Sequence, residues 1–149
     1  ASGLTLNFAL KAQTVLDSYG VKVDVWSITS FNELYRDGIK TERGNSLNNE
    51  KNKAYVEECF GSKLATIAVS EYQRSYGEQI RKWVNGDYVV LGTDGFGRSD
   101  TRQKLRDFFE ISTEHLVINA LIMLGKNSEA NNFIEKNQII ISKEAPWQK

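Results

Sequence analysis

Cysteine, histidine and proline are nearly absent from this 149-residue chain, because each occurs only once, as Cys59, His115 and Pro146. A single cysteine excludes an internal disulfide, and one cysteine with one histidine cannot build a Cys/His zinc site. Free cysteine of this kind is typical of a reducing compartment. We therefore predict a cytoplasmic location and a buried, chemically inert Cys59.

A charge excess and long apolar runs are also missing. Lys and Arg number 19 and Asp and Glu number 19, so the formal net charge is zero. No long-range field favours nucleic acid or an anionic membrane surface. No apolar stretch is long enough to span a bilayer, and residues 1–20 show no signal-peptide pattern. We predict neither a nucleic-acid partner nor a membrane partner.

Hydrophobic periodicity predicts alternating helices and strands. Helical spacing covers residues 4–19, 30–38, 55–60, 72–83, 100–109, 113–124 and 128–137, and apolar strand patterns cover 21–25, 64–69, 88–91 and 139–141. Residues 38–53 are polar and predict a mobile surface loop. This order predicts a three-layer α/β domain over residues 1–141, with a mostly parallel sheet and helices on both faces. Residues 142–149 are expected to form a frayed or disordered tail.

A glycine-rich loop between the strand at 88–91 and the helix at 100–109 is the most informative segment. Ligands and partners of open α/β sheets gather where the strands end, and this loop lies there. Its glycines permit sharp turns, and Asp100 is placed to cap the following helix. Phe96 stands at the predicted loop tip with Arg98 beside it. A large apolar residue and a charged donor in that position predict a protein interface.

The same loop has a second interpretation, as an anion or nucleotide site over Gly92–Asp100. Gly95 and Gly97 begin a pattern close to the dinucleotide-binding fingerprint Gly-x-Gly-x-x-Gly. Asp100 replaces the third glycine, however, and Asp94 and Asp100 outweigh Arg98, which leaves the loop with a net charge of minus one. Carboxylates compete with a phosphate for the same amide donors. The alternative of a free-standing nucleotide binder remains open but is the weaker one.

Three segments together resemble one enzyme family: residues 24–38, the stretch from Tyr72 to Arg81, and above all residues 91–100, Leu-Gly-Thr-Asp-Gly-Phe-Gly-Arg-Ser-Asp. They are similar to the C-terminal domain of the homodimeric bacterial pyruvate dehydrogenase first component, a member of the transketolase superfamily. The resemblance extends to about Leu124. After Glu42-Arg43 the chain departs from the family pattern, because Trp, His and Pro are missing from residues 44–49.

The resemblance implies a transketolase C-terminal fold and a division of labour. In this family thiamine diphosphate and magnesium lie between the two upstream domains, and the C-terminal domain supports the dimer. We therefore expect no catalytic, cofactor-binding or metal-binding residue here, and an inactive isolated domain. The implied partners are the upstream domains, the second subunit and, through the parent enzyme, the lipoyl acyltransferase component of the complex. The expected contact residues are Asp94, Phe96, Arg98, Ser99 and Asp100.

The resemblance leaves two further points. Another thiamine-dependent relative of transketolase is an alternative parent. In addition, residues 1–3 match the turn after the family's first strand, so the chain is expected to lack that strand. We hypothesise that the unpaired strand edges left by this loss are covered by dimerisation or rearrangement.

Overall fold

The computed structural model describes residues 1–148, and these form an α/β fold in which helices alternate with two of the four predicted strands. Two short strands, β1 (Thr66–Val69) and β2 (Tyr88–Leu91), form a parallel sheet. The helices are α1 (Thr5–Asp17), α2 (Phe31–Asn48), α3 (Tyr55–Cys59), α4 (Arg74–Glu78), α5 (Arg102–Phe108), α6 (Thr113–Met123) and α7 (Asn127–Lys136), with single 3-10 turns η1 (Arg81–Trp83) and η2 (Pro146–Gln148).

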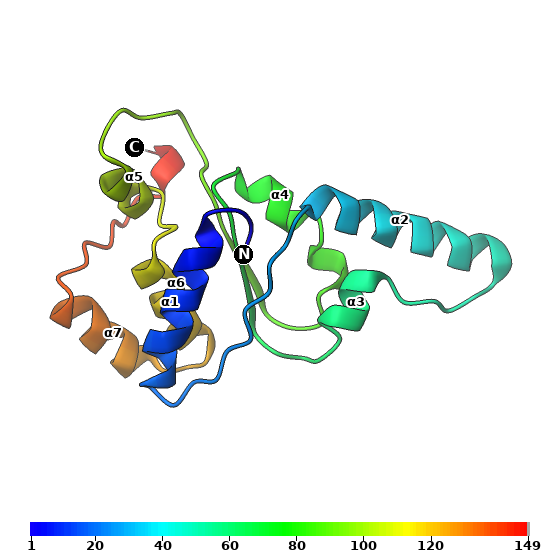
Figure 1. Ribbon diagram of the computed structural model, residues 1–149, viewed down its shortest axis with the longest axis horizontal. Coiled ribbons are helices and arrows are strands. Elements are labelled where there is room, and N and C mark those ends of the chain that lie inside the picture. Colours follow the sequence, from blue (N-terminus) through cyan, green and yellow to red (C-terminus); the bar gives the residue numbers. More distant parts are fainter. Residues whose placement is uncertain (149) are drawn as a thin grey trace.

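The sheet lies between two layers of helices, as Figure 1 shows. Successive strand residues point to opposite faces, so each strand contributes to two cores. Val69 packs in one core with α1, α6 and α7, whereas Ala68 and Val90 pack in the other with α2, α3 and α4. The predicted three-layer α/β class is confirmed.

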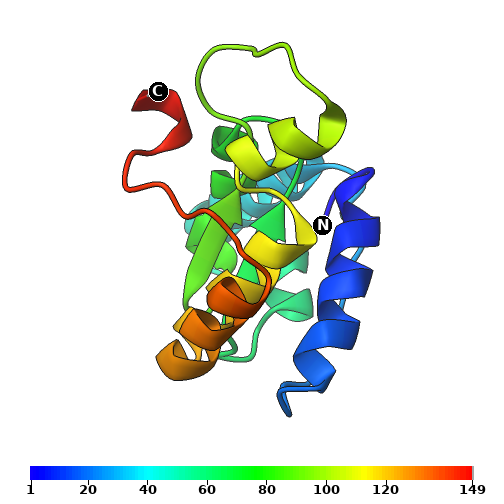
Figure 2. The same ribbon diagram turned by 90° about the vertical axis from the view of Figure 1, so that its left-hand side faces the viewer.

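The layer of α1, α6 and α7 is the more apolar of the two. Its centre is α6, on which Val117 and Leu121 are completely buried. A helix that is apolar nearly all round must be covered on several sides. α6 meets this requirement because it lies against α1, α7 and β1. Figure 2 shows α1 and α6 running side by side on this face.

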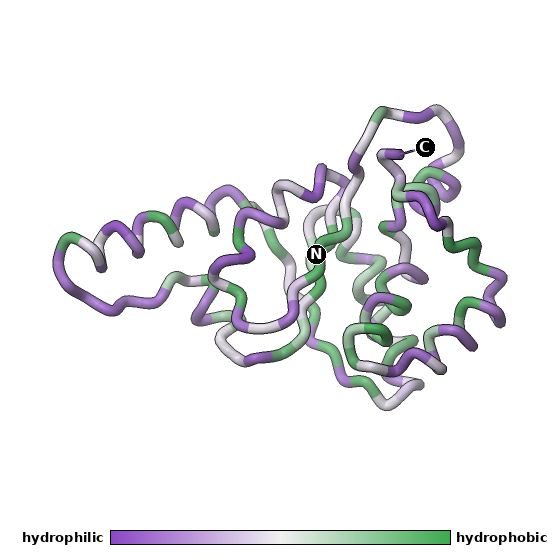
Figure 3. The backbone as a smooth tube through the Cα atoms, turned by 180° about the vertical axis from the view of Figure 1, so that it is seen from behind, coloured by the Kyte–Doolittle hydropathy of each residue, from purple (hydrophilic) through white to green (hydrophobic). Residues whose placement is uncertain are grey.

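The other layer projects away from the sheet along α2, whose exposed length is mostly hydrophilic (Figures 1 and 3). Ser30 caps its start as predicted, since the Ser30 hydroxyl accepts from the Glu33 amide at 3.2 Å. The expected helix end at Gly38 is wrong, because α2 continues to Asn48, and of the predicted loop over 38–53 only residues 49–53 lie outside a helix. A Cβ at Gly38 would lie only 2.5 Å from the indole of Trp83. This glycine permits a close contact inside a helix.

Two predicted strands do not form among the residues described. Residues 21–25 are extended but belong to no ladder, and residues 139–141 are irregular, with Ile140 exposed. A strand is defined by its hydrogen-bonded neighbour, which a sequence pattern does not supply. The predicted helix over 72–83 is also shorter than expected, since it divides into α4 and η1.

Candidate functional site

The predicted loop, residues 92–101, begins where β2 ends and is anchored at its base to the segment that follows β1. The Thr93 amide donates to the Tyr72 carbonyl at 2.9 Å, and the Asp94 carboxylate accepts from the Arg74 amide at 3.0 Å. Gly92 is required here, because a Cβ would lie 2.6 Å from the Tyr72 carbonyl oxygen. The carboxyl ends of both strands are thus held together at one edge.

The tip of this loop is exposed. Figure 2 shows it arching beyond the helices, and the Phe96 side chain at the tip is 88% exposed. The Arg98 guanidinium lies over the Phe108 ring, 5.1 Å from its centroid, which is within the range of a cation–π contact. Ser99 and Asp100 are exposed on the descending limb. Of the five predicted contact residues, Asp94 lies at the base of the loop and forms a hydrogen bond there, whereas the other four lie on its exposed part.

The capping residue of α5 is Thr101, so the prediction of Asp100 was one residue early. Thr101 has the extended backbone of an N-cap, and its hydroxyl accepts from the Lys104 amide at 3.4 Å. The Asp100 carboxylate accepts from the Thr101 amide at 2.7 Å and lies 3.7 Å from the Lys104 ammonium. These amides already have acceptors within the chain, which disfavours a phosphate at this helix start.

The carboxyl-terminal segment lies against the same loop, which the sequence did not indicate. Pro146 is buried in η2, and the Cα of Trp147 would lie 3.0 Å from a Cβ at Gly95. The Arg74 guanidinium lies 5.7 Å from the centroid of the Trp147 ring. A tryptophan within a polar tail was the one available signal, because such a residue seldom remains fully in solvent. That residues 142–149 are a separate tail stays a prediction.

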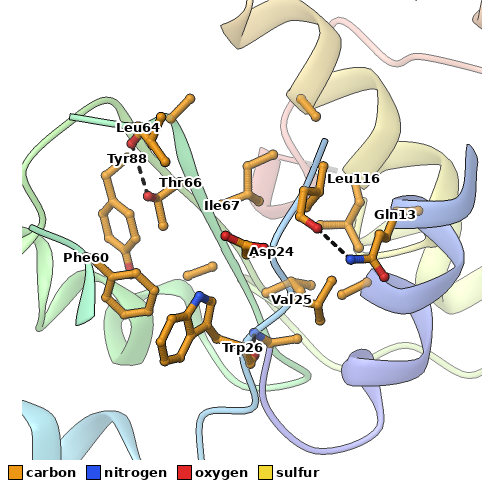
Figure 4. Close-up of a pocket in the computed structure, with 18 of the residues that line it drawn as sticks. Gln13, Asp24, Val25, Trp26, Phe60, Leu64, Thr66, Ile67, Tyr88 and Leu116 are labelled. Atoms are coloured by element: carbon orange, nitrogen blue, oxygen red, sulfur yellow. Dashed lines mark hydrogen bonds between the residues drawn. The ribbon is translucent and has the colours of Figure 1, made fainter. Parts of the chain in front are cut away.

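A second feature is an apolar cavity of about 320 Å³ between the extended residues 21–28 and β1. Figure 4 shows Asp24, Val25 and Trp26 on one side of it and Thr66 and Ile67 on the other. The Trp26 and Phe60 rings meet edge to face at its rim, with centroids 5.3 Å apart. The sequence did not indicate this cavity, because its walls come from segments far apart in the chain.

Buried titratable groups lie outside the loop. His115 is only 4% exposed, its Nδ1 lies 3.0 Å from the Ser112 hydroxyl, and its Nε2 has no hydrogen-bond partner among residues 1–148. Burial lowers the pKa of His115 below its ordinary value of 6.5. Burial also raises the pKa of Tyr88, whose hydroxyl donates to the Gly77 carbonyl at 2.7 Å. The Arg81 guanidinium lies 5.0 Å from the centroid of the Tyr88 ring, and the hydrogen bonds described for Tyr88 and His115 run to a carbonyl and to a hydroxyl.

Over the described part of the chain, no three His, Cys, Asp or Glu side chains lie close enough together to hold a metal ion. No helix within residues 1–148 is both long and apolar enough to cross a membrane. The described residues thus offer an exposed loop and an apolar cavity as candidate sites.

Comparison with known proteins gives a consistent result. Residues 1–112 match the model of the family described as the transketolase-like TK C-terminal domain.

Curated relatives share one name, pyruvate dehydrogenase E1 component. The protein of Pseudomonas aeruginosa is 47% identical over 122 residues, which is 79% of this chain and 14% of the relative. A Buchnera aphidicola relative is 43% identical over 132 residues, 87% of this chain and 15% of its own length. The Escherichia coli K12 relative is 39% identical over 142 residues, 93% of this chain and 16% of its own length. The chain thus spans about one-seventh of these relatives.

Proposed function

The chain belongs to the transketolase-like C-terminal domain family, and from this membership we propose that it is the C-terminal domain of a pyruvate dehydrogenase E1 component. The relatives with that name are 39–47% identical to it. The parent activity is the oxidative decarboxylation of pyruvate, with acetyl transfer to lipoamide in the pyruvate dehydrogenase complex. In this proposal the domain supports the dimer, works in the cytoplasm, and meets the lipoyl acyltransferase component only through the parent enzyme.

The family relationship implies thiamine diphosphate and magnesium, and the residues of this chain do not fit that group. A diphosphate–metal site needs free amide or cationic donors and oxygen ligands that converge. At the start of α5 the Thr101 and Lys104 amides are already bonded to Asp100 and Thr101, and no metal-holding cluster of acidic side chains forms among the described residues. We therefore assign the cofactor and the chemistry to the rest of the parent enzyme.

The observation that carries the structural role is the exposure of Phe96. A phenylalanine that is 88% exposed at the carboxyl edge of a sheet is costly in water and well placed to bury itself in a partner. Arg98 stands beside it over Phe108, where its planar donors can reach a carboxylate. We propose that Phe96 and Arg98, with Asp94, Ser99 and Asp100, contact the upstream domains or the second subunit.

A domain graft tests this proposal. The chain replaces the homologous segment of the Pseudomonas aeruginosa relative, and light scattering and pyruvate decarboxylation are measured. We expect a dimeric, active enzyme. Phe96→Ser should weaken subunit association roughly 30-fold, as expected for loss of an interface anchor worth about 2 kcal/mol. The chain alone should bind no thiamine diphosphate in calorimetry, and micromolar binding with magnesium would refute the division of labour.

Ile140→Ser is the matched control, because Ile140 is 90% exposed but lies outside the loop. It should leave association and activity unchanged. Equal effects of the two serine variants would contradict the role of Phe96. A folded, dimeric graft that decarboxylates no pyruvate would contradict the proposal that this domain can support a pyruvate dehydrogenase.

A further inference from the structure

The exposed loop that carries Phe96 is held on both of its limbs. At its base the Thr93 amide donates to the Tyr72 carbonyl at 2.9 Å. On the descending limb the Arg98 guanidinium lies 5.1 Å from the centroid of the Phe108 ring. The tip of the loop lies between these two attachments.

Phe96 stands at this tip between two glycines, Gly95 and Gly97. Gly95 has a φ of +100°, which residues with a side chain rarely adopt, and a Cβ at Gly97 would meet nothing within 4 Å. Glycine has the largest backbone freedom of any residue. A phenylalanine between two unrestrained glycines would lose much conformational entropy when a partner orders it, and this loss weakens binding.

A third attachment restrains the first of these glycines. It comes from residues 142–148, which we call the strap, and Figure 1 shows η2 of this strap under the arch of the loop, beside α5. The strap is folded by its own bonds, because the Ala145 amide donates to the Gln148 side chain at 3.0 Å and the Gln148 amide donates to the Ala145 carbonyl at 2.9 Å. Pro146, which lies between them, is buried.

Trp147 of the strap lies directly against the loop. A Cβ at Gly95 would be 3.0 Å from the Cα of Trp147 and 3.3 Å from its Cβ, so a glycine is needed for the two backbones to approach this closely. The centroid of the Trp147 ring lies 5.7 Å from the Arg74 guanidinium, within the range of a cation–π contact. The Arg74 amide in turn donates to the Asp94 carboxylate at 3.0 Å. Trp147 thus joins Gly95 to the segment that already holds the base of the loop.

We propose that Trp147 is a positioning residue, which restrains Gly95 and so preorganises Phe96 for the partner that the loop contacts. With the strap in place, only Phe96 and Gly97 separate the contact at Gly95 from the contact at Arg98. This inference rests on the proposed interface role of Phe96. It adds the contact that keeps this side chain in one direction before binding.

The loss of this contact does not open a core. Trp147 is 50% exposed and lies outside both apolar cores. Trp147→Ser should therefore leave the fold intact. The expectation of a frayed tail over residues 142–149 is the competing outcome, since a frayed segment cannot restrain Gly95.

Backbone amide relaxation measured by NMR tests the strap in the chain itself. We expect order parameters of roughly 0.85 at the Gly95 and Phe96 amides of the unmodified chain, as in a rigid backbone, and below about 0.6 in Trp147→Ser. Trp147→Phe retains a ring beside Arg74 and should keep both values high. Trp26→Ser is the matched control, because Trp26 is 45% exposed but lies at the rim of the cavity, and it should change neither value.

Subunit association of the grafted Pseudomonas aeruginosa enzyme tests the consequence. Trp147→Ser should weaken association roughly tenfold, as expected when one more backbone residue must be ordered on binding. In the Phe96→Ser background the same substitution should add almost nothing, because Trp147 acts through Phe96. Light scattering over a dilution series measures the single and double variants together.

The outcomes separate the strap from the interface. Unchanged order parameters in Trp147→Ser, or low values already in the unmodified chain, would overturn the strap and leave the interface standing. Additive losses in the double variant would also overturn it, because Trp147 would then contact the partner itself. Unchanged association in Phe96→Ser would refute the proposed interface and the positioning role together.

Discussion

Gly38 and Gly44 lie in the same helix, α2, and substitution of each by alanine should change stability in opposite directions. A Cβ at Gly38 would lie 2.5 Å from the Cε2 and Cζ2 atoms of the Trp83 indole. A Cβ at Gly44 would meet nothing within 4 Å. The chemical change is identical, so the difference in stability isolates the contact with Trp83.

The indole is not free to move aside. Trp83 is 4% exposed, its Nε1 donates to the Glu42 carboxylate at 3.0 Å, and its ring meets Tyr35 edge to face at 5.9 Å. Added methyl groups in such a packed site cost about 1–3 kcal/mol. Replacement of a helical glycine by alanine raises the free energy of unfolding by about 0.5–1 kcal/mol in both variants.

Gly44→Ala should therefore stabilise the chain by about 0.5–1 kcal/mol, and Gly38→Ala should destabilise it by about 1–2 kcal/mol. Urea unfolding followed by circular dichroism gives both values, since the midpoint moves while the slope stays constant. Tryptophan emission supplies a second readout, because displacement of the Trp83 indole changes its surroundings in Gly38→Ala alone.

The refuting result is a Gly38→Ala variant as stable as Gly44→Ala, with the emission of the unmodified chain. That outcome would mean that α2 and Trp83 are not in contact at Gly38. The explanation for a helix that continues through a glycine would then be wrong.

Two further predictions concern the other core and the buried basic groups. Leu121→Ala should cost about 2–5 kcal/mol of unfolding free energy, because Leu121 is fully buried, whereas Ile122→Ala beside it, 51% exposed, should cost much less; urea titrations of both check this. Burial lowers the pKa of the Ala1 amino group in the folded state from 8.0 to about 6, so the folded state binds fewer protons than the unfolded state between these values. The free energy of unfolding should therefore rise by about 2 kcal/mol from pH 6 to pH 8. Nα-acetylation should remove this pH dependence. The lowered pKa of His115 has the same sign below pH 6.5, where His115→Gln should flatten the profile; a flat profile in the unmodified chain would contradict both assignments.

Local sequence patterns were sufficient where an element is defined by its own residues. The helical spacing from Leu4 to Tyr19 predicted α1, and the apolar runs at 64–69 and 88–91 predicted the two strands that form. Each of these patterns marks which face of an element must leave water. Ser30 likewise caps α2 through a bond to its own first turn, which is readable from spacing alone.

Local patterns were insufficient where a partner decides the outcome. Residues 21–25 alternate as a strand does, yet they belong to no ladder, because no strand among the described residues pairs with them. Gly38 has the appearance of a helix end, yet the helix continues, because Trp83 packs against it from a distant part of the chain. Gly38 was correctly singled out as a special position, but its predicted role as a helix end was wrong, since it makes room for Trp83.

The loop could be predicted from local patterns, whereas the cavity could not. Residue patterns were enough to predict that a glycine-rich loop with Phe96 at its tip follows an apolar strand, and to indicate which family the chain resembles. Only the tertiary contacts placed Trp147 against Gly95 and brought residues 21–28 and β1 together around an apolar cavity. The physical reason is that hydrophobic pattern and capping act over a few residues, whereas ladders and cavities require segments tens of residues apart to meet.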